Sequence, residues 1–437
     1  MRDFAISDNP QVQAQLDRLG ALSLPSGRIG LAVIHELLDR LGNPQRDLPP
    51  VFHVAGTNGK GSTCAYLRAM LEAEGLTVHA ATKPHLVRYN ERIRIDGAEA
   101  DDAALCQAFA RIDAVRGERS LTYFEFGTLA ALELFWKAGI DIALLEVGLG
   151  GRLDAVNAVD SDAALVVSID LDHTEWLGPD RDSIGYEKAG IYRPGRPALC
   201  ADPAPPQRLI AHAATIGARL QCLGRDYRFA RDGDVWRWQS GEARLDDLPL
   251  PALAGAHQLG NAAAAIATLA CLSQRIAVPP AAIRAGLQHV RLPGRFQIVP
   301  GPVEWILDVA HNPHGATALA AHLRERPCAG LTHAICGLLA DKDAGGVIQA
   351  LTGVVHDWYT TTLDGPRGRS AVELAELLSA IGARAAAAGD VLSACQAARA
   401  SAVPGDRIVV LGSFHTVAPV LAAQPWLLSP LSPSRET

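Results

Sequence analysis

Residues 51–63 join an apolar run to a glycine-rich loop that contains one lysine. The run Val51–Ala55 leads into Gly56-Thr57-Asn58-Gly59-Lys60-Gly61-Ser62, and a helix-like stretch begins at Ser62. In such a segment the glycines let backbone N–H groups close on an anion, and the helix N-terminus and the lysine add positive charge. We therefore expect a site for the phosphates of a nucleotide triphosphate. The spacing differs from the common GxxxxGK[ST] loop, so a plain glycine turn stays open as an alternative.

Three more polar residues stand at or after the ends of apolar runs. Glu146 ends one run and is followed by glycines, His173 follows another run, and Lys188 lies further along. Ligands of open α/β sheets bind beyond the carboxyl ends of the strands, and oxygen-rich sites there favour Mg²⁺. A carboxylate in that place is costly unless it is paired or metal-bound. A buried salt bridge for Glu146, a cap or core role for His173 and a surface position for Lys188 remain alternatives.

The second half of the chain repeats this arrangement. Asp308 ends an apolar run, and His311 and Asn312 follow it before the next helix-like stretch. Asp308 suits a ribose hydroxyl or the incoming amine of a substrate, and His311 and Asn312 sit where a loop could reach across to the first domain. Gly412–Thr416 makes a similar strand-to-helix turn. Each of these segments could also be only a turn with a helix N-cap.

The elements that must position these residues alternate along the chain, which predicts an α/β fold of mostly parallel sheets with helices on both faces. The expected strands are 51–55, 140–147, 163–169, 303–309, 333–337 and 407–412. The expected helices are 62–74, 103–115, 126–137, 261–271, 315–324, 371–381 and 391–400. Residues 227–244 predict a short antiparallel hairpin. We expect a P-loop-type ATPase domain over residues 1–290 and a smaller Rossmann-like domain over residues 291–437.

The bulk composition bounds the class of protein. A chain of 437 residues is too long for one ordinary core, so two domains are expected. With 49% hydrophobic and 20% charged residues it is typical of a globular protein, and no apolar run is long enough to span a bilayer. The first residues lack the apolar stretch of a signal peptide, which predicts a cytoplasmic location. The net charge of -7 argues against a nucleic-acid partner.

Together, these segments resemble the dihydrofolate synthase/folylpolyglutamate synthase family of Mur-type ligases. The resemblance runs from Gly56 to Thr416, and this many segments in order are highly specific. The matching segments are 56–62, 84–86 with 91–93, 146–157, 172–178, 187–191, 257–258 with Asn261, 293–296, 308–313 and 412–416.

The resemblance implies an ATP-dependent amide ligase. A folate-type carboxylate attacks the γ-phosphate of ATP, and the α-amine of L-glutamate then attacks the acyl phosphate, which releases ADP and phosphate. Such a site needs charge neutralisation and alignment more than covalent catalysis. The family implies ATP and Mg²⁺ as cofactors, small-molecule substrates and a monomer that binds neither nucleic acid nor membrane. A single-activity synthase, a related Mur-type ligase and a weakened ATP- or folate-binding protein are the alternatives.

The resemblance also implies roles for individual residues. The implied catalytic residues are Lys60, Glu146, His173, Lys188 and His311, of which Lys188 matches a lysine that is carbamylated in many relatives. The implied metal ligands are Ser62, Glu146 and His173. Besides the loop 56–62, the implied ATP contacts are Asn261, Arg295 and Asp308. The implied substrate contacts are Thr122, Phe124, Arg152, Asp154, His311 and Ser413.

One residue departs from the family pattern. Lys83 stands in Thr82-Lys83-Pro84-His85-Leu86 where the family usually has a serine that coordinates Mg²⁺. An ammonium cannot coordinate a metal, and a divalent cation repels it strongly at low dielectric. Lys83 could swing out, replace one metal charge, or remove this metal site. We expect weakened or altered metal binding.

Overall fold

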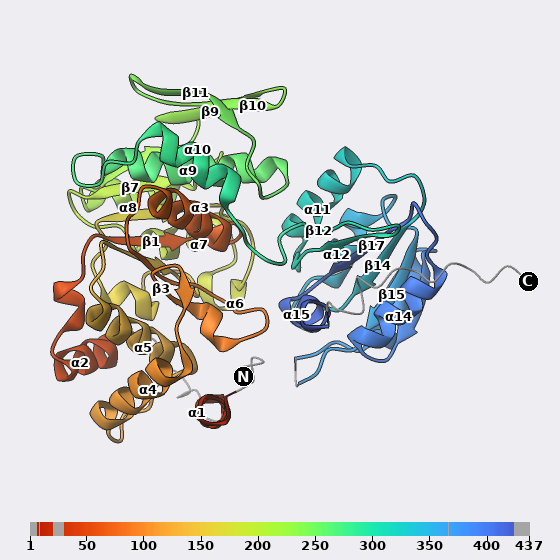
Figure 1. The fold of residues 1–437 in the computed structure, drawn as a ribbon, viewed down its shortest axis with the longest axis horizontal. Helices are drawn as coiled ribbons and strands as arrows, with labels where there is room; N and C mark the ends of the chain where they lie inside the picture. The colour runs from red at the N-terminus through yellow and green to blue at the C-terminus, as the bar shows by residue number, and fades with distance from the viewer. Residues whose placement is uncertain (1–6, 8, 21–29, 366, 424–437) are drawn as a thin grey trace, which may run out of the picture. The chain divides into compact units, whose positions relative to one another are not determined.

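The structure is a computed structural model that describes residues 7, 9–20, 30–365 and 367–423, and it divides into two units (Figure 1). Unit 1 comprises Met1–Ala252 and His257–Arg291, and unit 2 comprises Leu253–Ala256 and Leu292–Thr437. The division after Arg291 lies one residue from the predicted boundary. The sequence did not indicate that Leu253–Ala256 belongs with unit 2. These residues stay there because Gly255 packs directly against the imidazole ring of His322.

Unit 1 is built on an eight-stranded sheet with the order β4-β3-β2-β5-β1-β6-β7-β8. Neighbours from β2 to β8 are parallel, and β3 and β4 add an antiparallel edge. The central strands are buried along their whole length, as expected for a parallel sheet that is covered on both faces. The strands are Val51–Ala55 (β1), Val78–Ala81 (β2), Ile93–Ile95 (β3), Ala98–Glu99 (β4), Ile142–Glu146 (β5), Ala163–Val166 (β6), Pro197–Cys200 (β7) and Arg219–Cys222 (β8).

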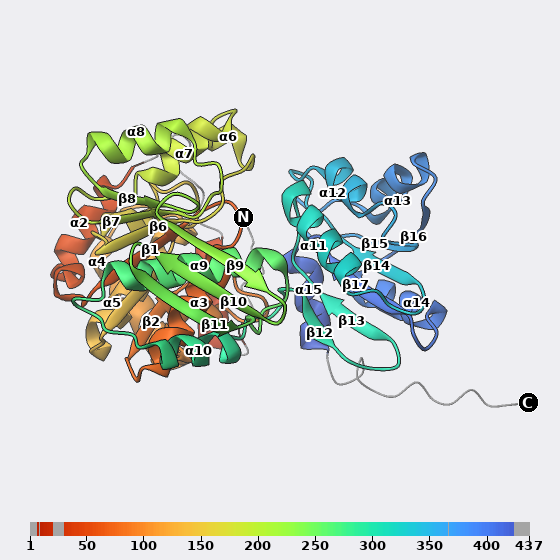
Figure 2. The same ribbon diagram turned by 90° about the horizontal axis from the view of Figure 1, so that it is seen from above.

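Helices cover both faces of this sheet. Helix α3 packs against β1, β2 and β5 on one face of the sheet and also contacts α10. Helix α5 shares a hydrophobic core with the opposite face of β5. Helices α6, α7 and α8 lie together (Figure 2). The α-helices are Pro10–Gly20 (α1), Ala32–Leu41 (α2), Lys60–Ala73 (α3), Asp102–Arg116 (α4), Tyr123–Ala138 (α5), Thr174–Leu177 (α6), Arg181–Ala189 (α7), Gln207–Thr215 (α8), Ala256–Cys271 (α9) and Pro280–His289 (α10), and the 3-10 helices are Pro44–Asp47 (η1), Tyr89–Arg92 (η2) and Ala155–Ala158 (η3).

The prediction of a two-stranded hairpin is wrong, because this segment contains a third strand. Residues 227–249 form a three-stranded antiparallel sheet of Tyr227–Asp232 (β9), Val235–Ser240 (β10) and Ala243–Pro249 (β11). The pairing of β10 with β11 shifts register between Trp236 and Trp238. This irregularity and the charged residues of β11 hide the alternation that would have marked the third strand.

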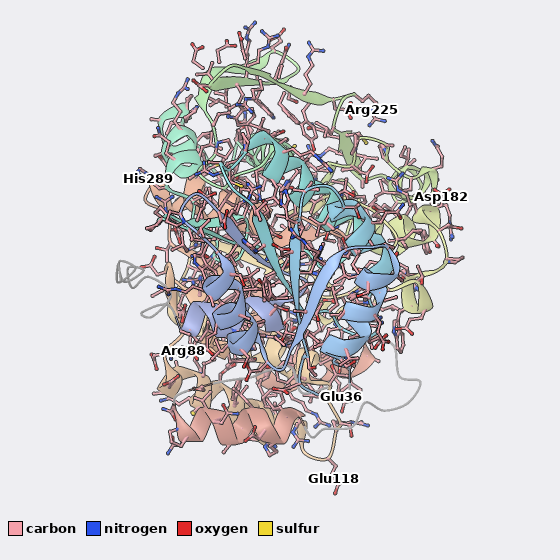
Figure 3. All side chains as sticks on the ribbon, turned by 90° about the vertical axis from the view of Figure 1, so that its right-hand side faces the viewer. Glu36, Arg88, Glu118, Asp182, Arg225 and His289 are labelled. Carbon is pink, nitrogen blue, oxygen red and sulfur yellow. The ribbon has the colours of Figure 1, made fainter. Side chains whose placement is uncertain are left out.

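Unit 2 is a six-stranded sheet with the order β12-β13-β17-β14-β15-β16, in which only β12 runs antiparallel to its neighbour. Helices α11, α12 and α13 share a core on one face, and α14 and α15 lie on the other (Figures 2 and 3). The strands are Gln297–Val299 (β12), Glu304–Leu307 (β13), Thr332–Cys336 (β14), Asp357–Thr361 (β15), Arg384–Ala388 (β16) and Arg407–Leu411 (β17). The helices are Pro313–Glu325 (α11), Ala344–Leu351 (α12), Ala371–Ala380 (α13), Val391–Ser401 (α14) and Phe414–Ala422 (α15).

The predicted α/β class with mostly parallel sheets is confirmed. Strand β1 spans the predicted residues, and the other five predicted strands differ from the observed ones by a few residues at their ends. The edge strand β16 was not predicted, because four of its five residues are alanine, which has low β propensity. No helix among the described residues has the length and apolar character needed to cross a membrane.

Candidate functional site

The glycine-rich loop 56–59, which the sequence predicts to bind phosphate and which we call the phosphate loop, lies between β1 and α3. It stands at the carboxyl end of a central strand. Gly56 has a φ of 152° and Gly59 has a φ of 88°. Residues other than glycine rarely adopt backbone conformations with such positive φ values. A Cβ at Gly56 would stand 2.8 Å from Cγ2 of Val167, and one at Gly59 would stand 2.6 Å from Oδ1 of Asn261. Both glycines are therefore required by backbone conformation and by space.

Ser168 holds this loop in place from the end of β6. Its carbonyl accepts from the Thr57 N–H at 2.7 Å, and its hydroxyl accepts from the Asn58 N–H at 3.1 Å and donates to the Asn58 carbonyl at 2.9 Å. The Lys60 ammonium donates to the carbonyls of Gly56 at 2.9 Å and Thr57 at 3.2 Å. The lysine charge thus lies within the loop that would receive an anion.

A chain of buried amides connects the loop to α9. Nδ2 of Asn261 donates to Oε1 of Gln258 at 3.0 Å, and Nε2 of Gln258 lies 3.4 Å from the Ser62 hydroxyl in the first turn of α3. Both amide side chains are buried, as is Ser62. The structure therefore brings the predicted residues Gly59, Ser62 and Asn261 together, and it adds Gln258 between them.

Glu146 ends β5 and is buried. Its Oε2 accepts from the backbone N–H of Lys83 at 2.9 Å. The Lys83 ammonium lies 3.1 Å from the centre of the Phe124 ring. Burial lowers the pKa of Lys83 to about 8, and the charges of Asp154 and Glu146 oppose that shift. Lys83 is therefore directed into the site and does not swing out of it.

Asp154 holds the glycine loop that follows β5. Its Oδ2 accepts from the N–H groups of Gly148 at 3.0 Å and Leu149 at 2.9 Å, and its Oδ1 accepts from the Val156 N–H at 3.0 Å. The predicted substrate contact Asp154 thus holds the glycine loop in place through its hydrogen bonds.

The predicted substrate contact Arg152 is paired with an acidic residue of α7. Its side chain donates to Oε1 of Glu187 at 2.9 Å.

Lys188 is buried in α7. Burial and, to a smaller extent, the charge of Lys60 lower its pKa to about 7, against the opposing charges of Asp172 and Asp154. The surface position left open for Lys188 is therefore wrong. His173 precedes α6 with a φ of 52°, is exposed, and lies with Nε2 3.8 Å from Oδ1 of Asp172.

The fit of these residues to Mg²⁺ differs between positions. The Ser62 hydroxyl stands in the first turn of α3, directly after the glycine-rich loop, where a hard cation could share phosphate oxygens with it. Glu146 is a suitable oxygen donor, but the Lys83 ammonium supplies a positive charge beside it. No group of three or more histidine, cysteine, aspartate or glutamate side chains within the described ranges could hold a metal ion by itself. A cation at Ser62 fits the structure better than one at Glu146.

The predicted residues of unit 2 gather at the carboxyl ends of β13 and β17. Asp308 accepts from the N–H groups of Phe296 at 2.8 Å and Ala310 at 2.7 Å. Burial raises the pKa of Asp308, and the Arg295 guanidinium is the main opposing charge. Arg295 lies 5.0 Å from the centre of the Phe414 ring, and the His311 and Phe414 ring centres are 6.4 Å apart. These side chains form one polar and aromatic cluster.

Three predicted residues act as helix caps. Thr122 and Glu125 form a reciprocal capping box that starts α5. Oδ1 of Asn312 accepts from the Gly315 N–H at 2.8 Å, and the Ser413 hydroxyl accepts from the His415 N–H at 3.1 Å. A cap fixes the direction of the strand-to-helix turn, so this role is compatible with ligand contacts from the same turn.

The sequence analysis did not identify Ser168, and it gave no role to Gln258 and Phe414, although both lie in segments that carry the family resemblance. Gln258 precedes the predicted Asn261 by three positions, and helical spacing would have placed both on one face. Phe414 follows the predicted Ser413 directly. No local signal marks Ser168, because its contacts are made to residues about 110 positions away.

Comparison with known proteins agrees with this geometry. The Mur ligase, glutamate ligase domain family matches residues 294–414. The dihydrofolate synthase/folylpolyglutamate synthase of Escherichia coli (strain K12) is 45% identical over 90% of this chain and 90% of that protein.

Two solved structures have the same fold over nearly the whole chain. The structure of E. coli FolC in complex with DHPP and ADP has a TM-score of 0.90 and 43% identity, over 97% of this chain and 99% of that one. The Yersinia pestis bifunctional folylpolyglutamate synthase/dihydrofolate synthase complexed with AMPPNP and Mn ion has a TM-score of 0.89 and 46% identity, over 96% and 98%. The resemblance noted in the sequence is confirmed, and the chain belongs to the dihydrofolate synthase/folylpolyglutamate synthase family.

Proposed function

We propose that this chain is an ATP-dependent ligase that joins L-glutamate to dihydropteroate and to folates. The observation that carries the proposal is the 45% identity to the E. coli enzyme over 90% of the chain. The phosphate loop supports it, because its required glycines, Lys60 and the anchored Ser62 are all in place.

The chemistry proceeds in two transfers. A carboxylate oxygen of the acceptor bonds to the γ-phosphorus of ATP, and the bond between that phosphorus and ADP breaks. The amine nitrogen of glutamate then bonds to the acyl carbon, the bond from that carbon to the phosphate oxygen breaks, and the amine loses a proton. The loop N–H groups and Lys60 bind and orient the phosphates, which provides the alignment on which such transfers depend.

The other predicted residues keep their proposed roles. Asn261, Arg295 and Asp308 contact ATP, His311 and Ser413 contact glutamate or ATP, and Thr122, Phe124, Arg152 and Asp154 contact the acceptor. Mg²⁺ would be held at Ser62 together with the phosphates, and it would shield phosphate charge. Glu146 and His173 are the further ligands that the family resemblance implies, and the Lys83 side chain makes a cation at Glu146 less favourable than one at Ser62.

The proposal is tested by identifying the product. The purified chain is incubated with ATP, Mg²⁺, L-glutamate and either dihydropteroate or tetrahydrofolate, and mass spectrometry measures the addition of a glutamyl residue. Products from both acceptors support a bifunctional enzyme, and a product from tetrahydrofolate alone supports a single-activity synthase. Absence of product from both acceptors would overturn the proposal.

Matched lysine variants control this experiment. Lys60→Ala should lower turnover about 100-fold or more, because the phosphates lose their charged partner. Lys137→Arg keeps the ion pair with the buried Glu133 near the end of α5, outside the site, and should leave turnover unchanged.

The oligomeric state and location belong to the same proposal. The chain acts as a monomer on small molecules in the cytoplasm and binds neither nucleic acid nor membrane. Light scattering of the purified chain should give the mass of one copy, and a stable dimer would refute this part.

A further inference from the structure

Three side chains that are distant in sequence converge beside Gly148. A Cβ built on Gly148 would lie 3.3 Å from Nζ of Lys83, 3.1 Å from Oδ2 of Asp154 and 3.1 Å from Cζ of Phe124. The ammonium, the carboxylate and the aromatic ring thus surround a single point in the glycine loop after β5. A larger residue than glycine at position 148 would displace at least one of them.

The Lys83 ammonium is held in this place by several contacts. Its Nζ lies 3.1 Å from the centre of the Phe124 ring, where the negative face of an aromatic ring attracts a cation. The backbone N–H of Lys83 donates to Oε2 of Glu146, which fixes the start of the side chain beside that carboxylate. Burial lowers the pKa of Lys83, and the charges of Asp154 and Glu146 oppose that shift.

Lys60, the other lysine of this region, has different partners from Lys83. Lys60 directs its ammonium to the carbonyls of Gly56 and Thr57 in the phosphate loop. Lys60 and Lys83 also act on each other as like charges. The two lysines therefore serve different positions, Lys60 in the loop and Lys83 over the Phe124 ring beside Gly148.

A divalent cation on Glu146 would share this part of the site with the ammonium, which lies beside Gly148, two residues after Glu146. Like charges close together repel strongly in a site that water enters poorly, and a charge of two doubles the effect. A lysine also offers no lone pair to the metal while it is charged. Glu146 thus accepts the backbone N–H of Lys83, while the ammonium of the same residue lies over the Phe124 ring, beside the glycine loop that follows Glu146.

We propose that the Lys83 ammonium is a built-in counter-ion for Glu146 and Asp154 that takes the place of a divalent cation at Glu146. The inference rests on the proposed function, because it concerns the cations that accompany ATP. The nucleotide still brings the cation that it shares with Ser62. The chain then uses one divalent cation fewer than it would with a small oxygen ligand at position 83.

Cation counting tests this proposal without turnover. The full chain and its Lys83→Ser variant are saturated with AMPPNP and titrated with Mn²⁺, and electron paramagnetic resonance measures the free Mn²⁺. Lys83→Ser should bind about one Mn²⁺ more per chain than the unchanged protein, because it loses a repelling charge and gains a hydroxyl. Equal numbers of bound Mn²⁺ with equal affinities would overturn the proposal.

A second variant at position 83 and a control variant at position 137 complete the Mn²⁺ count. Lys83→Met preserves volume and removes the charge, so it should also bind the additional Mn²⁺, with lower affinity than Lys83→Ser. It replaces the serine variant if thermal unfolding shows that the latter does not fold, and an unchanged count in Lys83→Met would then overturn the proposal. Lys137→Arg, which keeps the ion pair with the buried Glu133, is the control outside the site and should leave the count unchanged.

The count and the ligase assay can fail independently. AMPPNP is not turned over and no acceptor is present, so the Mn²⁺ count is valid even if no glutamyl product forms. A chain that forms product but whose Mn²⁺ count is insensitive to position 83 would contradict only the counter-ion role of Lys83.

Discussion

Lys188 illustrates how burial prepares a single residue for chemistry. A pKa of about 7 leaves about half of its amine neutral at pH 7, whereas an ordinary lysine is almost fully charged there. Only the neutral amine reacts with carbon dioxide, so this environment favours the carbamate that the family resemblance implies. Incubation with ¹³C-labelled bicarbonate should therefore give a carbamate signal in the ¹³C NMR spectrum.

The variant Lys188→Gln assigns that signal. It removes the buried amine and keeps a polar side chain of similar length, so the carbamate signal should disappear. A signal of the same size in Lys188→Gln would place the modification elsewhere, and no signal in either protein would contradict carbamylation of Lys188.

His53 lies in the middle of β1 and makes the stability of the chain sensitive to acid. Its side chain is fully buried, and neither ring nitrogen has a hydrogen-bond partner in the part of the chain that the structure describes. Burial lowers its pKa to about 3, and the Arg193 charge adds to the effect. Between about pH 3 and pH 6.5 the unfolded chain binds more protons at this residue than the folded chain does. The free energy of unfolding should therefore fall as the pH falls through this range.

The expected slope from His53 is about 1.4 kcal/mol per pH unit below about pH 6.5. His53→Leu should remove this contribution and raise the stability at pH 7 by about 1 kcal/mol, because a buried group without a hydrogen-bond partner is replaced by an apolar one. Urea unfolding of both proteins from pH 5 to pH 7 measures the difference. Parallel stability profiles would contradict the assignment.

At the scale of elements, the turn from β1 to α3 depends on glycine for two separate reasons. Gly59 and Gly75 have nearly the same φ, 88° and 86°, but a Cβ meets Asn261 at Gly59 and open space at Gly75. Gly75→Ala should therefore cost about 1 kcal/mol of stability through backbone strain alone. Gly59→Ala should in addition weaken ATP binding about 10-fold or more, because Asn261 and the loop must move apart.

Calorimetric titration with an ATP analogue separates the two effects. Gly75→Ala should bind the ATP analogue with the affinity of the unchanged protein. Similar affinities for both variants would mean that the contact between Gly59 and Asn261 has no part in nucleotide binding.

The pattern of elements was largely predictable, because buried parallel strands are continuous apolar runs. Strand β1 was predicted to the residue, whereas β16 depends on pairing with β15 and has no apolar signal of its own. The loop glycines were also predictable from type and spacing. Ser168 was not, because its role follows from the adjacency of β1 and β6, which no local pattern specifies.

At the scale of the whole molecule, a short stretch of chain belongs to a unit other than the one that surrounds it in sequence. Gly255 has a φ of 118°, and a Cβ there would stand 2.1 Å from the ring of His322 in α11. Gly255→Ala should therefore loosen α11. Hydrogen exchange measured by mass spectrometry should show faster exchange over Pro313–Glu325.

The turn glycine Gly241 provides the control for this experiment. It also has a positive φ, of 55°, but a Cβ there would meet open space. Gly241→Ala should leave exchange over α11 unchanged. If Gly255→Ala behaves in the same way, residues 253–256 are not part of the packing of unit 2.

The candidate site could be predicted only as separate segments. The residues Lys60, Glu146 and Lys188 were identified from their places at strand ends and from the family resemblance. Their mutual electrostatics required the structure, because the sequence left three outcomes open for Lys83, and the structure places its ammonium over the Phe124 ring beside Gly148. A long side chain has many rotamers, and only the packing around it selects one.

The central claim is that the chain transfers the γ-phosphoryl group of ATP to the acceptor carboxylate before glutamate is joined. Dihydropteroate labelled with ¹⁸O in its carboxylate tests this claim directly, with mass spectrometry of the released phosphate. Each released phosphate should contain one ¹⁸O atom and should form only when glutamate is present. Glutamate-dependent product with unlabelled phosphate would contradict the acyl phosphate, and absence of any glutamate-dependent phosphate would contradict the ligase itself.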